Sequence, residues 1–322
     1  MKKIVALAIV VVVVAAGYTV AWLWAAGQAG DYVKRLETAD GIDTPRLVCA
    51  SFGIGGFPFG FDATCTEATI QTGDVTIEVS GLKASVEVYR PTHALVFAQG
   101  PATIEDAFTG SRSRLDFNAA RGSARLDGWR IARVSTVLEE PLWTDTLFGD
   151  RLLARADQLE LHLIDAPEKH DAAAGLATVA VYAKAEGLDA PGPGIAAGEA
   201  TFEAEITNLP DDVRSYGDAD LLRRWQAAGG RLEQARFKGD AADLALEASG
   251  TLGLDGAGRV EGQLQLRSSG VVERLGPLLP EQYRGLIVGA QDADGSYSQA
   301  LTFTGGVVFS GLVPAGMVPP LF

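Results

Sequence analysis

The chain has 322 residues, of which 47% are hydrophobic and 21% charged, and its formal net charge is −14. This composition excludes a wholly disordered chain. The acidic balance argues against a nucleic-acid partner, because binding phosphates needs a basic face. The negative net charge also predicts repulsion between the protein and anionic lipid head groups. Any lipid would therefore have to bind to an apolar surface of the protein.

The first segment of the chain is typical of a membrane anchor. Residues 4–26 carry no charge and follow two lysines, Lys2 and Lys3. As a helix they would span roughly 34 Å, enough to cross a bilayer core. Tyr18, Trp22 and Trp24 lie toward the far end, where an aromatic belt is expected.

The alternative to a retained anchor is a secretory signal peptide, with the small residues at 27–29 as its cleavage site. We favour the anchor, because the apolar region of a signal peptide is usually about 7–15 residues long. The lysines then place residues 1–3 in the cytoplasm. We therefore predict a single-pass protein of the inner membrane with its body in the periplasm. Residues 27–45 are expected to form a linker with a short helix.

Two cysteines enclose a loop rich in glycine and phenylalanine, CASFGIGGFPFGFDATC, from Cys49 to Cys65. Two cysteines in an oxidising compartment should pair. A disulfide closing a loop of this length would stabilise the fold by about 3 kcal/mol in the chain-entropy model. Metal binding is disfavoured because no third cysteine or histidine lies nearby, and a redox dithiol would normally read C-x-x-C.

The same segment carries aromatic side chains on either side of its glycines. The flanking sequences alternate in polarity as strands do, so we predict a hairpin-like loop stapled by the disulfide. Four phenylalanines are then candidates for an apolar surface that meets a ligand or a partner: Phe52, Phe57, Phe59 and Phe61.

Alternating strand patterns dominate the rest of the chain. They indicate a first β-rich half over 46–165 and a second over 176–322, separated by the loop at 166–175. Similar strings in the two halves suggest a distant repeat. Helices are expected near 218–228 and 270–290. The predicted fold class is mostly β with a few helices (α+β), built as extended, curved antiparallel sheet after an N-terminal transmembrane helix.

The sequence offers no recognisable catalytic constellation. The histidines, His93, His162 and His170, stand far apart, and neither an H-E-x-x-H pair nor a G-x-S-x-G elbow occurs. Paired acids such as Asp292 and Asp294 are better explained by turns, because position 303 lacks the glutamate of a calcium loop. We therefore expect no enzyme activity, no metal site and no cofactor.

The cysteine loop, the string LDGWRIA and the ending GTLGLDGAGRVEGQLQL to TGGVVFSGLVPAGMVPPL resemble a family of membrane-anchored envelope proteins of Gram-negative bacteria, domain of unknown function 2125. The likeness covers nearly the whole chain after the anchor. One departure is Gly60, which stands where that family's loop often has a basic residue. The resemblance implies location and architecture but no activity.

The strand meander is also similar in style to proteins of the AsmA kind, anchored envelope proteins with long curved sheets that are thought to handle lipids. That likeness holds only at the level of the fold. Two hypotheses for function follow. The first is a lipid or other amphiphile held on a curved sheet. The second is a ligand-free structural or interaction protein of the cell envelope, bound to another envelope protein.

Overall fold

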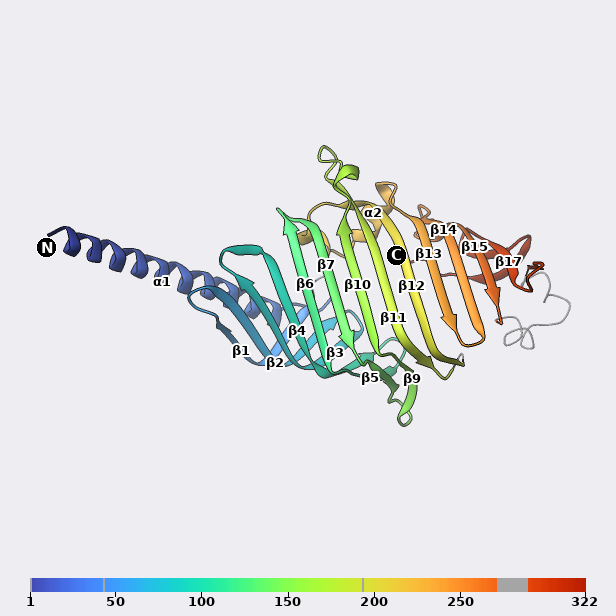
Figure 1. Cartoon of the computed structure of the whole chain (residues 1–322), viewed down its shortest axis with the longest axis horizontal. Helices are drawn as coiled ribbons and strands as arrows, with labels where there is room; N and C mark the ends of the chain where they lie inside the picture. The colour runs from blue at the N-terminus through green and yellow to red at the C-terminus, as the bar shows by residue number, and fades with distance from the viewer. Residues whose placement is uncertain (1, 43, 193, 271–288) are drawn as a thin grey trace.

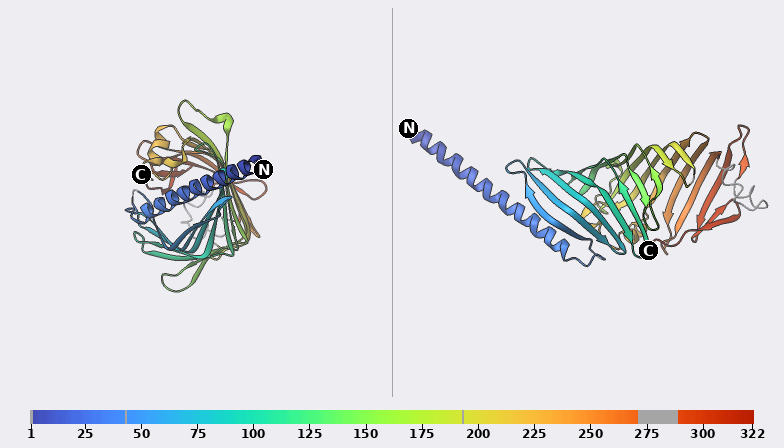
Figure 2. Two further views of the ribbon diagram at one scale, coloured as in Figure 1. Left: turned by 90° about the vertical axis from the view of Figure 1, so that its left-hand side faces the viewer. Right: turned by 90° about the horizontal axis from the view of Figure 1, so that it is seen from below.

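The computed structural model describes residues 2–42, 44–192, 194–270 and 289–322. They form one large antiparallel sheet preceded by a long helix, which confirms the predicted fold class. The strands lie side by side along the molecule (Figure 1), and the view along its long axis shows them following an arc (Figure 2).

The strands have these bounds: β1 Arg46–Gly55, β2 Gly60–Thr72, β3 Val75–Glu87, β4 Arg90–Asp106, β5 Ser111–Asp116, β6 Ala119–Asp127, β7 Arg130–Glu139, β8 Leu142–Asp145, β9 Arg151–Arg155, β10 Gln158–Asp165, β11 Leu176–Ala190, β12 Ile195–Pro210, β13 Arg231–Ala241, β14 Leu244–Leu254, β15 Val260–Ser269, β16 Ala290–Gln291, β17 Tyr297–Thr304, β18 Val307–Ser310 and β19 Val313–Met317. The helices are α1 Lys2–Glu37, η1 Pro167–Lys169, η2 Val213–Ser215 and α2 Leu221–Ala227.

The main path of the sheet is a meander that omits β5, β8, β9 and β16. Its order is β1–β2–β3–β4–β6–β7–β10–β11–β12–β13–β14–β15–β17–β18–β19, with every pair antiparallel. A side path, β5–β8–β9, leaves the sheet at β4 and rejoins it at β11. These short strands lie at the lower end of the arc in Figure 1.

The division of the path at β4 has a local cause. The register between β3 and β4 shifts at Gly100 and Pro101, and proline has no N–H to continue the ladder. The strand before this point, His93–Ala98, pairs with β6, whereas the strand after it, Ala102–Asp106, pairs with β5. The bulge therefore directs the two halves of one strand to different neighbours.

Helix α1 joins the expected anchor and the expected polar helix into one element that continues to Glu37. Its C-terminal part runs beside β1 and shields that edge of the sheet, where Arg46 Nε donates to Glu37 O at 3.1 Å. The opposite edge is β19, which is short and contains Pro314, a residue that suits an unpaired edge. Both ends of the sheet are thereby protected from pairing with another chain.

The two β-rich halves share one sheet, since β10 pairs with β11 across the loop at 166–175. Helix α2 lies inside the expected range 218–228 and packs on β12 through Trp225, whose Nε1 donates to Thr207 O at 2.7 Å. The helices expected over 270–290 fall almost entirely on residues 271–288, which lie outside the described residues.

The predicted disulfide between Cys49 and Cys65 is present. It links β1 to β2 diagonally, because Cys49 is opposite Ala68 and Cys65 is opposite Phe52. Both cysteines belong to a core cluster in which Ala68, Val79 and Ala102 are buried, with Phe52 and Leu82 packed against them. The disulfide thus cross-links the first hairpin at this core cluster.

A nearly buried ion pair fixes the loop that joins the two halves. The Arg130 guanidinium lies 3.2 Å from the Asp165 carboxylate, and the two side chains are only 16% and 9% exposed. A second guanidinium nitrogen lies 2.6 Å from His170 Nδ1, and His170 Nε2 lies 3.0 Å from Asp211. The sequence analysis assigned no partner to His170, because these residues meet only when the strands are assembled.

Candidate functional site: the apolar face of the sheet

One face of the sheet is apolar across nearly its whole length. Residues directly paired in neighbouring strands point to the same side, so the strand register identifies which side chains share a face. We define the apolar face by one such row, followed from β1 to β15: Ile54, Ala63, Ala84, Val96, Gly122, Thr136, Leu161, Ala183, Phe202, Phe237, Ala248 and Leu266.

The other face carries charges on the same strands. Its matching row, displaced by one residue, is Thr64, Lys83, Phe97, Arg121, Val137, Glu160, Lys184, Thr201, Lys238, Glu247 and Arg267. Acidic and basic side chains are interspersed, as in the contact of Lys184 Nζ with Glu199 at 3.1 Å. This polar face is suited to water, and the apolar face is not.

The apolar face is the more buried face of the sheet along several neighbouring strands. Along β13 to β15 its side chains are partly buried, whereas those of the polar face are exposed. Small residues such as Ala183 and Ala248 occupy much of it, which leaves room above the strands. Helix α1 also meets the sheet on this side, because its Trp22 stacks on Phe61.

Little of the described chain covers the middle of the apolar face. The two α-helices make their main contacts with β1 and β12, at a distance from β6, β7 and β10. Val96 and Leu161 remain 41% exposed. The chain exposes 19048 Å² in all, whereas a compact monomer of 33.8 kDa exposes about 12,800 Å². A helix that protrudes and a sheet that is open on one face both increase the exposed area.

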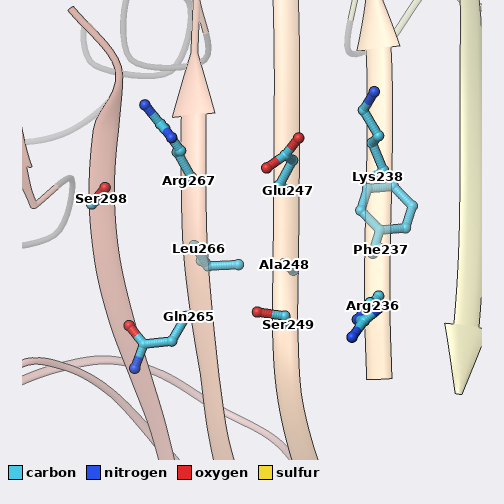
Figure 3. Close-up of a pocket in the computed structure, with 10 residues that line it drawn as sticks. All are labelled: Arg236, Phe237, Lys238, Glu247, Ala248, Ser249, Gln265, Leu266, Arg267 and Ser298. Atoms are coloured by element: carbon cyan, nitrogen blue, oxygen red, sulfur yellow. The ribbon is translucent and has the colours of Figure 1, made fainter. Parts of the chain in front are cut away.

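A pocket of about 470 Å³ lies on β13, β14, β15 and β17 (Figure 3). Most of its lining residues belong to the polar face, including Lys238, Glu247 and Arg267. Its cations have acidic neighbours, since Arg267 contacts Asp294 at 2.5 Å and Lys238 contacts Asp240 at 3.2 Å. This pocket is therefore a shallow part of a charge-balanced surface and is separate from the apolar face.

Among the described residues, no group of three histidine, cysteine or acidic side chains could hold a metal ion. His162 lies on the polar-face side of β10, 3.0 Å from Glu160, and stacks on Tyr182. His93 Nε2 lies 2.9 Å from Ser123 Oγ. Each histidine has a local structural partner.

Two carboxyl groups with lowered pKa values predict acid sensitivity, Glu160 on the polar face and Asp189 near the end of β11. Contact with His162, and then with Gln158, lowers the pKa of Glu160, and contact with Arg155 lowers the pKa of Asp189. A carboxyl whose pKa is depressed in the folded state contributes stability above its unfolded pKa and loses it as the pH falls through the folded one. We expect the urea midpoint to be constant from pH 7 to about 5 and to fall below about pH 4.

Measuring the urea midpoint from pH 7 to pH 3 tests this expectation. Glu160→Gln should reduce the acid-induced loss, because the substituted side chain no longer titrates. A midpoint that stays unchanged down to pH 3 in the unsubstituted chain would contradict a stabilising role for these contacts.

The glycine-rich loop between β1 and β2 returns to helix α1. Gly56 adopts a positive φ of 95°, and a Cβ there would lie 2.8 Å from Gly60 O, so the tight turn requires glycine. Trp22 Nε1 donates to Gly60 O at 2.9 Å, and the Tyr18 hydroxyl donates to Pro58 O. The Trp22 ring also meets Phe57 edge-on, with centroids 5.4 Å apart.

The structure divides the four predicted phenylalanines into two pairs. Phe52 and Phe61 are partly buried on the apolar face, where Phe61 stacks on Trp22 at a centroid distance of 5.2 Å. Phe57 and Phe59 lie in the loop and are exposed. Trp22, expected to face the membrane interface, is instead only 8% exposed because it packs on the body, whereas Trp24 is exposed.

The sequence reading missed most of the apolar face. Alternation identified its strands one at a time, and aligning the alternating residues of successive strands could have revealed the continuous row. It also missed the turn between β3 and β4, where Val88 N–H donates to Phe59 O at 2.9 Å. That contact has no local sequence signal, because the turn and the loop are brought together by strand pairing.

Comparison with known proteins identifies a family. The model of a family described as uncharacterised proteins conserved in bacteria (DUF2125) matches residues 22–319. No curated protein and no solved structure matches the chain.

Proposed function

Because the chain belongs to the DUF2125 family, whose description assigns no activity, we propose a function from its geometry: the protein holds a lipid or similar amphiphile on the apolar face, while α1 anchors it in a membrane. The observation that carries this proposal is the row of residues that continues from Ile54 to Leu266 without a charged side chain and with Thr136 as its one polar member. An ordinary folded core would be covered on that side.

The energetics favour an acyl chain as the ligand. Each methylene group removed from water contributes about 0.8 kcal/mol, and the row offers contact along many strands. The apolar face needs no charged group to bind such a chain, and the polar face keeps the complex in water. The role proposed is binding rather than catalysis, with no cofactor and no nucleic acid involved.

The anchor determines where this would happen. Helix α1 is long and apolar enough to cross a membrane. We propose that residues 4–26 span the inner membrane once and that the body lies in the periplasm, where the Cys49–Cys65 bridge is stable. The ligand would then be drawn from the lipids of the envelope.

The experiment uses two neighbouring residues that differ in the face they occupy. Val96 lies on the apolar face and is 41% exposed, whereas Phe97 lies on the polar face and is 39% exposed. The photoreactive residue benzoylphenylalanine is placed at each position in the full chain, cells are irradiated, and the purified protein is examined by intact-mass spectrometry.

We expect a lipid adduct at position 96 and none at position 97. Equal thermal stability of the two variants would show that the difference does not come from misfolding. Lipid adducts at neither position, or equally at both, would contradict the proposal. A protein adduct at position 96 in place of a lipid would favour the ligand-free interaction protein of the envelope.

A further inference from the structure

We infer that the turn regions at one end of the sheet insert into the interface of the same bilayer that α1 spans, so that the body is seated on the membrane. The residues are Phe57 and Phe59 in the β1–β2 loop and Val88 and Tyr89 in the β3–β4 turn. We name them the interfacial cluster. All four are exposed large apolar or aromatic side chains.

The first argument is the position along α1 at which the loop returns. A hydrocarbon core of about 30 Å takes up about 20 helical residues, so within the proposed span 4–26 the core counted from Ile4 ends near Leu23 and the remaining residues lie in the interface. The loop is bonded to the helix at Tyr18 and Trp22, just before that point. A loop held against these residues cannot lie far from the outer boundary of the core.

The second argument is the chemistry of the helix on either side of this point. Before it, α1 is apolar and exposed from Ile4 to Val14. Beyond it the helix becomes polar, and Asp31 and Lys34 form an ion pair at 3.7 Å. Exposed apolar side chains continue to Trp24, and the first charge after Lys3 is Asp31. The change from an apolar to a polar helix surface therefore lies just beyond Trp22, which Phe57 touches.

The third argument is the composition of the cluster. Aromatic residues are enriched at membrane interfaces, because a ring can lie among acyl chains while a polar group stays in water. Tyr89 has this character, and its hydroxyl donates to Glu87 at 2.6 Å. The β3–β4 turn is tied to the loop through the bond from Val88 N–H to Phe59 O, so both turns meet the interface together.

The interfacial cluster continues into the apolar face. Ile54 and Phe61 flank the loop in β1 and β2, and both point to that face. If the loop lies in the membrane interface, these first residues of the apolar face lie next to lipid. The inference itself stands whether or not the apolar face holds a ligand, because it concerns only where the loop lies.

The test measures the depth of the cluster in a bilayer. Phe59→Cys supplies one free thiol, since both native cysteines are in the disulfide. The full chain is labelled with a nitroxide, reconstituted in phosphatidylcholine vesicles and examined by electron paramagnetic resonance. Relaxation by oxygen, which partitions into lipid, is compared with relaxation by a nickel chelate, which stays in water.

Phe108→Cys is the matched control. Phe108 is also an exposed aromatic residue beside a turn, 85% exposed against 73% for Phe59. Phe108 follows the C-terminal end of β4, whereas Tyr89 precedes its N-terminal end. The 17 residues of β4 between them correspond to about 50 Å along an extended strand. Tyr89→Cys gives a second reading of the cluster in case the label at residue 59 disturbs the loop.

We expect the ratio of oxygen to nickel accessibility to be several-fold higher at residues 59 and 89 than at residue 108. Equal ratios at all three positions would overturn the inference. Labels at residues 59 and 89 shielded from both reagents would overturn it in favour of a protein partner. A mature protein that begins after residue 26 would also overturn it, because the contacts with Tyr18 and Trp22 would be absent.

Discussion

Replacing Arg130 by methionine is expected to lower the free energy of unfolding by about 3 kcal/mol, because it leaves the nearly buried Asp165 carboxylate without its cation. The methionine retains most of the apolar part of the arginine side chain. The loss of unfolding free energy therefore measures the effect of removing the charge rather than a change in packing. The Asp165 carboxylate and the His170 ring both lose a guanidinium contact. The measurement is urea unfolding of the full chain in detergent, followed by circular dichroism.

Arg125→Met is the control for this prediction. Arg125 lies in the same hairpin but is exposed, so its replacement should change stability by no more than about 0.5 kcal/mol. Replacing Asp165 by asparagine in the Arg130→Met background should recover part of the loss, since the uncompensated charge is then removed. A loss below about 1 kcal/mol for Arg130→Met would mean that water reaches the pair.

Removing the disulfide with the double substitution Cys49→Ala and Cys65→Ala is expected to cost about 3 kcal/mol of unfolding free energy. The bridge restricts the unfolded chain, and its sulfur atoms also pack in the core cluster with Ala68 and Val79. The same urea titration measures the effect. Limited proteolysis should show faster cleavage between residues 49 and 65, where the loop loses its fastening.

The matched comparison is the unsubstituted protein treated with reductant. It should lose a similar amount of stability, because it loses the same cross-link without losing the sulfur atoms. If reduction has no effect while the double alanine variant is destabilised, the contribution comes from packing alone. If neither treatment changes the midpoint, the bridge does not contribute to stability and the chain-entropy argument fails.

The strands could be predicted from the sequence because their polarity pattern depends only on residues close together in the chain. Val75, Ile77 and Val79 alternate with polar residues, and the structure places them in β3 as expected. The pairing of Cys49 with Cys65 followed from their isolation in an otherwise cysteine-free chain, and the structure contains that disulfide. These features depend on residue spacing of two and on simple counting, which the sequence contains in full.

The sequence predicted only part of the candidate site. Phe57 and Phe59 were predicted as apolar surface, and the structure places them in an exposed loop. Their contact with Tyr18 and Trp22 was not foreseen, since the residues are about 40 positions apart and nothing local links them. The sequence analysis expected the Trp22 ring to face lipid head groups, but the ring packs on Phe57 and Phe61, because hydropathy cannot distinguish lipid from a packed aromatic partner.

The sequence by itself determined the long apolar helix, the antiparallel strands, the acidic polar surface and the disulfide, because each depends on composition or on short-range periodicity. Tertiary structure decided the rest. Strand register joined single apolar residues, from Ile54 to Leu266, into one continuous face. The return of β1 beside α1 brought Phe57 to the end of the predicted span. Both results come from contacts between distant segments, whose geometry is set by how many strands assemble together rather than by any one of them.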